Sequence, residues 1–306
     1  MTGSPLVLLL ALALDAVLGE PQWLWSRLPH PAVVMGRAVG WVDRSFNTGN
    51  RRRLKGTLTL LALVLLAGLL GWALQAWIPG QLADVIVVAI LVAQKSLVQH
   101  VAAVASALRE NLEAGKRAVS MIVGRDTTGM DVPAVSRAAI ESAAENFSDG
   151  ITAPVFWYLL GGLPGILIYK VTNTADSMIG HRTERHEAFG WASARFDDVL
   201  NYIPSRLTGA LILLSHGLFS GWGKVAREAR QHRSPNAGWP EAAMARCLNV
   251  ALSGPRSYGG EIRDFPVIYP AGDRSPGPEA IDRSVTALWR SWAGLCAVSL
   301  LLLALF

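Results

Sequence analysis

The chain has 306 residues, of which 51% are hydrophobic and only 17% are charged. It is too apolar for an ordinary soluble domain of this length, so we expect one integral membrane domain over residues 1–306. The net charge is +5, but the basic residues are dispersed among apolar segments and form no basic stripe with aromatic residues. We therefore expect the lipid bilayer as a partner, and no nucleic acid.

The first apolar segment, residues 5–18, is short for a complete crossing and contains Asp15. It lacks the basic start of a secretory signal peptide, so we expect a retained, shallow or re-entrant helix. Residues 57–78 form the clearest span, because they are uncharged and long enough to cross about 30 Å of hydrocarbon. The basic residues before this span predict that its start lies in the cytoplasm; they are Arg51, Arg52, Arg53 and Lys55.

The chain is expected to return through the membrane over residues 85–108. Lys95 and Gln99 interrupt this segment four residues apart, so they share a helix face that should point into the bundle. Further spans are expected over residues 207–222 and 288–306, where long apolar runs recur.

Residues 151–169 are apolar but contain Pro154, the pair Gly161 and Gly162, and Pro164. Proline inside a helix removes a hydrogen bond and clashes with the preceding turn, so we expect a broken helix or a hairpin within the membrane.

Three polar segments separate the apolar ones, and each carries several Lys or Arg residues. The positive-inside rule places all three in the cytoplasm, which is simplest if residues 151–169 do not fully cross. The predicted fold class is all-α: a multi-pass inner-membrane protein with broken or re-entrant helices and its functional site on the cytoplasmic side. The three segments are residues 109–149, 170–206 and 223–287.

Acidic residues are grouped on one predicted helix that starts at Asp131, just before Pro133. Glu141, Glu145 and, if the helix continues, Asp149 follow at four-residue intervals on one face. Carboxylates aligned in this way repel one another unless a cation or arginines neutralise them, and oxygen ligands suit magnesium carrying a nucleotide. The alternative is an acidic face that is simply solvated.

A second group of polar residues follows the broken apolar segment. Asn173 and Asp176 lie three residues apart and share a helix face, while Arg182 and Arg185 have planar guanidinium groups that suit phosphate. The alternative for these arginines is contact with lipid head groups. The same mixture of acid, amide and arginine recurs downstream, in Arg195, Asp197, Asp198, Asn201 and Arg206.

The repetition points to a metal and a polyanion bound together. The chain contains no glycine-rich phosphate loop of the GxxxxGK[ST] kind, so a nucleotide would have to be held in another way.

Several longer sequence blocks occur in one order along the chain: LDAVLGEP, HPAVVMGR, SMIVGRDT, ESAAENFSDGITAPVFW, the block from GGLPGILIYKVTNTADSMIGHRTERHEAFG to WASARFDDVLNYIPSRLT, and SPNAGWPE. Together they resemble the cobalamin biosynthesis proteins of the CobD/CbiB type, the adenosylcobinamide-phosphate synthases. The resemblance covers nearly the whole chain. One small departure is Glu20 of the first block, where the family commonly has aspartate, which keeps the charge.

The resemblance implies an integral membrane amide synthase that uses ATP and Mg²⁺. Its substrates would be the propionate carboxyl of adenosylcobyric acid, a corrinoid, and an amino alcohol, either aminopropanol phosphate or aminopropanol. The related AmpE-type membrane proteins, which have no known synthase role, fit less well because the long central block is matched here. The sequence is compatible with a homo-oligomer as well as with a single chain.

Two other classes were weighed. A transporter would also carry intramembrane charges and a broken helix, but no internal repeat is visible. A membrane prenyltransferase or phosphotransferase would use paired acidic motifs, and only an N-x-x-D pair, Asn173 and Asp176, is present.

Chemistry and resemblance together lead to candidate site residues in three roles. For metal binding or general-base catalysis we expect Glu141, Glu145, Asp149 and Asp176, with Asp197 and Asp198 as further metal ligands. For binding of phosphate or substrate we expect Arg125, Asn146, Lys170, Asn173, Arg182, Arg185, Arg195 and Arg206. Trp157, Trp191 and Trp239 would either line a corrinoid cleft or belong to the aromatic belt at the membrane surface.

Overall fold

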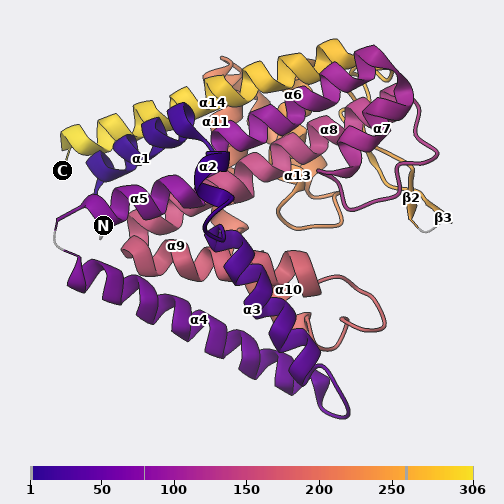
Figure 1. The fold of residues 1–306 in the computed structure, drawn as a ribbon. Coiled ribbons are helices and arrows are strands. Elements are labelled where there is room, and N and C mark those ends of the chain that lie inside the picture. Colours follow the sequence, from indigo (N-terminus) through magenta and orange to yellow (C-terminus); the bar gives the residue numbers. More distant parts are fainter. Residues whose placement is uncertain (1–2, 79, 259–260, 306) are drawn as a thin grey trace. The chain divides into compact units, whose positions relative to one another are not determined.

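The computed structural model describes residues 3–78, 80–258 and 261–305, which are mostly helical (Figure 1). The predicted all-α class is confirmed. The helices group into two compact units, and each is described by itself. Unit 1 comprises Met1–Ala93, Ala153–Asn201 and Ser299–Phe306, and unit 2 comprises Gln94–Thr152 and Tyr202–Val298.

Within the described residues, four helical stretches are long and apolar enough to cross a membrane. They are Arg52–Trp77, Leu82–Glu110, Val132–Ile179 and Pro278–Leu305, and Pro5–Leu18 is a shorter apolar helix. By length and composition these stretches indicate a multi-pass membrane protein, because each exceeds the roughly 20 residues needed to cross the hydrocarbon core.

Unit 1 is organised around α9, which packs against α3, α4, α5 and α10, while α1 packs against α5. Its apolar core includes Val39 of α3, Leu60 of α4 and Ile179 of α9. The helices of this unit are α1 (Pro5–Leu18), α2 (Gln22–Trp25), α3 (Pro31–Phe46), α4 (Arg52–Trp77), α5 (Leu82–Leu91), α9 (Ala153–Ile179) and α10 (Trp191–Leu200).

The contact between α4 and α9 is close because a glycine of α4 meets the backbone of α9. A side chain at Gly71 of α4 would place its Cβ 2.5 Å from the backbone nitrogen of Pro164 in α9. Only glycine leaves room for two backbones at this distance. The pair of helices is therefore held at short range along one stripe.

The predicted break in the segment 151–169 is confirmed. Gly162 has φ 60° and ψ −150° inside α9, a backbone conformation that no helix contains, and Pro164 follows two residues later. The proline cannot donate the hydrogen bond that would carry the helix through this point, and glycine adopts the positive φ at low cost.

The Gly162→Ala variant should therefore be destabilised by about 1–3 kcal/mol, because alanine is strained at positive φ. Its Cβ would also lie 2.7 Å from Nε2 of Gln75. Gly161→Ala is the matched control, since a Cβ there meets no atom within 4 Å. Thermal unfolding in detergent should show a lower midpoint for Gly162→Ala only; equal midpoints would contradict the break.

Several element boundaries differ from the sequence prediction, and the last helix begins at Pro278 rather than at residue 288. The segment 85–108 is divided at Val92, which is extended and precedes the polar residues that begin at Gln94, so α5 is followed by a separate α6. The helix expected over 207–222 is α11 (Tyr202–Ser215), which has 14 residues and ends before Gly217 at φ 70°. It begins five residues earlier than expected and is shorter than a complete crossing requires.

Unit 2 is built on α8, which packs against α6, α7 and α13, while α11 and α12 pack against α13. As predicted, α8 starts after Asp131, whose carboxylate accepts a hydrogen bond from the backbone N–H of Ala134 at 2.8 Å. The helices are α6 (Gln94–Glu110), α7 (Leu112–Ser120), α8 (Val132–Phe147), the π-helical turn η1 (Ser148–Thr152), α11, η2 (Phe219–Gly221), α12 (Trp222–Ala229), α13 (Gly238–Leu248) and most of α14 (Pro278–Leu305).

The strands of unit 2 are short and form two antiparallel pairs. β1 (Leu252–Ser253) pairs with β4 (Val267–Ile268), with Leu252 opposite Ile268. β2 (Arg256–Tyr258) pairs with β3 (Glu261–Arg263). The β1 pair matters for the site below, because it brings the backbone of Ser253 to α8.

Candidate active site

The most elaborate polar cluster of unit 1 surrounds Asp197 of α10. Its carboxylate accepts hydrogen bonds from the side-chain amides of Asn173, at 3.2 Å, and Asn201, at 3.0 Å. Asn201 in turn accepts a hydrogen bond from the hydroxyl of Tyr169 at 3.0 Å. Asp197, Asn201 and Tyr169 are all buried. The packing of α10 on α9 thus holds Asp197 in one orientation.

Asp197 is an unusual carboxylate because it is nearly removed from solvent without an arginine or lysine partner in an ion pair among the described residues. Burial raises the pKa of Asp197 to about 7, and the negative charge of nearby Asp176 adds to this effect, while the amides of Asn173 and Asn201 oppose it. Burial also raises the pKa of Asp198, against the charges of Arg195 and Arg182. Unit 1 therefore contains three neighbouring carboxylates, Asp176, Asp197 and Asp198, that repel one another.

Two arginines lie at the rim of this cluster. The Nη1 atom of Arg195 is 3.5 Å from the Oδ2 atom of Asp198, and the Arg195 side chain is 59% exposed. Arg182 is exposed as well and acts on the same carboxylate. Both arginines thus lie beside the acidic cluster, and their role in holding phosphate next to a cation stays a prediction.

The loop between α9 and α10, residues 180–190, is tied to the end of α3. Nε and Nη2 of Arg185 donate hydrogen bonds to Oδ2 of Asp43 at 3.2 and 2.8 Å. Asn47 donates to Asp43 at 2.8 Å and to the carbonyl of Arg185 at 3.0 Å. Burial opposes ionisation of Asp43, but hydrogen bonds from Asn47, Arg185 and His186 lower the pKa of this carboxyl below its usual range.

Sequence reasoning missed Asp43 and Asn47. Their signal was an acid and an amide four residues apart at the end of a helix, a pattern too common to single out. The basic group before α4 also contacts the loop, because Arg52 donates to the carbonyls of Glu184 and Arg185 at 3.3 and 3.4 Å. Arg53 lies over the ring of Trp191, with its Cζ atom 3.6 Å from the centroid.

Arg185 was predicted to bind phosphate, and the structure places its guanidinium group on Asp43, where we expect it to position the loop. We expect Arg185→Ala and Asp43→Asn each to lower the activity of the protein by about tenfold or more, because a displaced loop misplaces the rim arginines. The double variant should be no worse than either single one, and Arg37→Ala, an exposed arginine of α3, is the control. A much larger loss for Arg185→Ala than for Asp43→Asn would show direct substrate binding.

In unit 2, Glu141 forms a buried ion pair with Arg125. Nη2 of Arg125 is 2.8 Å from Oε2 of Glu141, and the two side chains are 10% and 6% exposed. The backbone N–H of Ser253 donates to Oε1 of Glu141 at 2.6 Å. The neighbouring Ser142 donates to the carbonyl of Ile122 at 2.7 Å, which fixes the segment that carries Arg125. The pair therefore joins three parts of unit 2.

The acids expected at four-residue intervals are not equivalent. Glu141 is buried, Glu145 is exposed, and Asp149 is half-buried in η1, because α8 ends at Phe147 and a wider turn follows. The regular helical spacing is lost before Asp149. Asn146, expected to orient substrate, is exposed and donates to the carbonyl of Ser142 at 2.9 Å.

Arg206 is enclosed by aromatic rings of unit 2. Its Cζ atom lies 3.5 Å from the ring centroid of Tyr202 and 4.6 Å from that of Trp239. It also donates to the carbonyl of Tyr202 and, at 3.4 Å, to Oδ1 of Asn236. These contacts fasten the loop before α13, so Arg206 orders the SPNAGWPE block.

The three tryptophans occupy different environments. Trp239 is buried beside Trp222, with ring centroids 5.0 Å apart, and belongs to the packing of unit 2. Trp157 donates to the carbonyl of Leu200 at 3.1 Å, and Trp191 is 40% exposed.

Among the residues that the structure describes, no three His, Cys, Asp or Glu side chains are placed to hold a metal ion by themselves. Magnesium carried by a nucleotide does not need such a set, because it is usually bound through one or two carboxylates and the phosphates. The carboxylates of Asp197 and Asp198, which are adjacent in sequence, are oxygen donors of the kind that magnesium needs.

Comparison with known proteins gives a consistent result over the whole chain. The model of a family described as CobD/Cbib protein matches residues 8–288. The chain is 48% identical over 301 residues to a cobalamin biosynthesis protein CobD of Brucella suis, covering 93% of this chain and 92% of that protein. It is 48% identical over 302 residues to one of Rhizobium meliloti, at 93% and 92% coverage, and 45% identical over 299 residues to one of Rhodobacter capsulatus, at 95% of each.

No solved structure matches the chain. The family match extends from α1 into α14, and the relatives are nearly as long as the chain and share almost half of its residues. The chain therefore belongs to the CobD/CbiB family of cobalamin biosynthesis proteins.

Proposed function

We propose that this protein is an adenosylcobinamide-phosphate synthase, a ligase that uses ATP to form one amide bond. The bond joins the propionate carboxyl of adenosylcobyric acid to the amine of aminopropanol phosphate or aminopropanol. The observation that carries the proposal is the family match along nearly the whole chain, and the acidic cluster with arginines at its rim in unit 1 supports it.

Amide formation from a free carboxylate needs activation, because the leaving group would otherwise be oxide. In the proposed first step a carboxylate oxygen attacks the γ-phosphorus of ATP, which forms an acyl phosphate and releases ADP. In the second step the amine attacks the acyl carbon, and phosphate leaves with the former carboxylate oxygen. The amine loses one proton, which a nearby base accepts.

The residues of unit 1 divide these tasks by their charge and burial. Arg182 and Arg195 hold the phosphate oxygens, because guanidinium groups bind phosphate through two parallel hydrogen bonds. Asp197 and Asp198 hold Mg²⁺, which when bound neutralises charge on the phosphates. Asp176, the third carboxylate of the cluster, accepts the proton of the amine. Asn173 keeps Asp197 oriented, as its hydrogen bond shows.

The acidic cluster is proposed to face the cytoplasm. The basic residues from Arg51 to Lys55 mark the cytoplasmic end of α4. Arg52 and Arg53 contact the loop 180–190 and Trp191, so the start of α10 lies at this same end of unit 1. ATP and the amino-alcohol phosphate are polar and would reach the cluster from the inner side of the bacterial membrane.

Of the predicted residues in unit 2, Glu141 and Arg125 are assigned to a structural ion pair, and Glu145 and Asp149 are kept as substrate or metal contacts. Glu145→Gln should then lose activity while the protein inserts and folds normally. Full activity of this variant would remove Glu145 from the site.

The test of the function is a reaction in detergent with purified protein, adenosylcobyric acid, aminopropanol phosphate and MgATP. We expect adenosylcobinamide phosphate, identified by mass spectrometry, and one ADP for each amide formed. A parallel reaction with aminopropanol determines the preferred amine. No corrinoid amide, or amide formed without nucleotide hydrolysis, would contradict the proposal and favour a transporter or an AmpE-like protein.

A further inference from the structure

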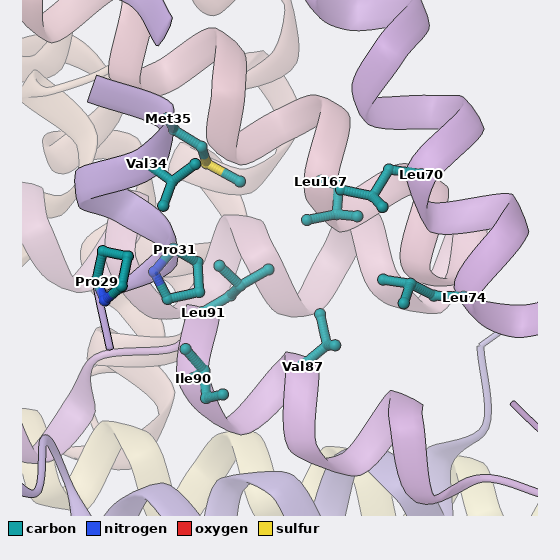
Figure 2. A pocket seen from close by; sticks show the side chains of 10 residues that line it. All are labelled: Pro29, Pro31, Val34, Met35, Leu70, Leu74, Val87, Ile90, Leu91 and Leu167. Carbon is teal, nitrogen blue, oxygen red and sulfur yellow. The ribbon is translucent and has the colours of Figure 1, made fainter. Parts of the chain in front are cut away.

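Unit 1 contains a cavity of about 310 Å³ that the proposed chemistry does not use (Figure 2). Its walls come from the start of α3 and from α4, α5 and α9, and every lining side chain is aliphatic, proline or methionine. Figure 2 shows Leu70 and Leu74 of α4 pointing toward the same space as Val87 of α5 and Leu167 of α9. Three consecutive helices, α3, α4 and α5, thus enclose one apolar space together with the distant α9.

Water does not suit this cavity, because a buried water needs two to four polar partners. An apolar cavity of about 150 Å³ already binds a molecule as large as benzene, and this one is about twice that volume. Side chains around an empty space also lose their packing contacts on one side. The lining therefore favours a hydrocarbon occupant.

The cavity opens toward the apolar surface of the unit. Val34 and Leu70, both on its lining, are 49% and 54% exposed. Leu70 belongs to α4, a candidate span of which only 11% of the most apolar stretch is buried. The hydrocarbon that meets such a surface is the acyl chain of a membrane lipid.

Opposite charges flank the cavity near His30, which lies between the lining residues Pro29 and Pro31. Burial lowers the pKa of His30. The carboxylate of Glu20 raises this pKa and the ammonium of Lys170 lowers it further, so both charges lie near the imidazole. Lys170 follows Leu167 by about one helical turn. A cation and an anion that both act on His30 suit a head group with a phosphate and an ammonium.

We propose that this cavity holds one acyl chain of a zwitterionic phospholipid, with the lipid phosphate at Lys170 and its ammonium at Glu20. The lipid would fill the space between α3, α4, α5 and α9 and stabilise unit 1. This assigns Lys170 to a lipid head group rather than to a nucleotide. The proposal does not depend on the synthase reaction.

The test uses the full chain purified in dodecyl maltoside and stripped of lipid, with dioleoyl phosphatidylethanolamine added back. Native mass spectrometry should show one lipid per chain. At a lipid concentration a hundred times the dissociation constant, the unfolding midpoint should rise by about 5 °C, because the lipid binds only the folded state. Val87→Trp fills the cavity and should abolish both effects. Its neighbour Ile86, which is 44% exposed and does not line the cavity, provides the control Ile86→Trp.

A second variant separates loss of the site from loss of the fold. Lys170→Met leaves the cavity open and should weaken binding of the lipid about tenfold, and a cooperative unfolding transition without lipid would show that this variant is folded. Lipid retained by Val87→Trp, no lipid on the wild type, or equal lipid affinity of Lys170→Met would overturn the proposal. Displacement of the lipid by adenosylcobyric acid would also overturn it, because the cavity would then belong to the substrate.

Discussion

Glu141→Ala should be the most destabilising single change in unit 2, lowering the free energy of unfolding by about 3–5 kcal/mol. The substitution leaves the guanidinium of Arg125 buried without its carboxylate, and it also removes the acceptor of the Ser253 N–H. Buried charges cost far more unpaired than paired, so the loss should exceed that of an exposed pair. Thermal or denaturant unfolding in detergent measures it.

The control is the double variant Arg125→Met with Glu141→Leu. Apolar residues of similar volume often replace a buried ion pair with little loss, so the double variant should recover most of the stability. It should also keep a substantial part of the synthase activity, because the pair is structural. A stable double variant without activity would show that Glu141 takes part in the chemistry.

Asp197→Asn should have opposite effects on stability and activity. Folding holds the pKa of Asp197 near 7, above the ordinary value of 3.8, so the folded protein keeps a proton that the unfolded chain releases. Asp197 therefore lowers the free energy of unfolding progressively as the pH rises from about 4 to about 7. Above pH 7 this decrease is complete. Asparagine removes this charge, and its single carbonyl oxygen keeps one of the two amide hydrogen bonds that Oδ1 and Oδ2 of Asp197 accept from Asn173 and Asn201.

Without magnesium and nucleotide, Asp197→Asn should raise the unfolding midpoint at pH 8 by about 5 °C and raise it less at pH 5. Activity should fall by about a hundredfold or more, because a neutral amide is a poor ligand for magnesium. Asp198→Asn is the matched control: it is half-buried and has Arg195 and Arg182 nearby, so its gain in stability at pH 8 should be smaller. A lower unfolding midpoint at pH 8 for Asp197→Asn would contradict the inference that the buried charge of Asp197 destabilises the folded protein.

The helices and the break in α9 were predictable because their signals are local. Hydrophobic length gave α4 and α14, Asp131 and Pro133 gave the start of α8, and the glycine pair with Pro164 gave the kink. The short α11 was not predictable, since the apolar composition continues past Ser215 and only Gly217 marks the end.

The sequence indicated which types of residue belong to the candidate site, but not which residues contact one another there. The sequence indicated that Asp197, Asp198, Arg182 and Arg195 belong to one chemistry, because acids and arginines recur there. It did not indicate that Glu141 is paired with Arg125, or that Arg185 is held by Asp43, 142 residues away. Such partners depend on tertiary packing, which one sequence does not display.

The most direct test of the account follows one oxygen atom. Adenosylcobyric acid labelled with ¹⁸O in the propionate carboxylate is converted with MgATP and aminopropanol phosphate, and the released phosphate is analysed by mass spectrometry. An acyl phosphate transfers one carboxylate oxygen to phosphorus, so each phosphate released with the amide should carry one ¹⁸O atom. Unlabelled phosphate accompanying the amide product, or no amide at all, would contradict the proposed reaction.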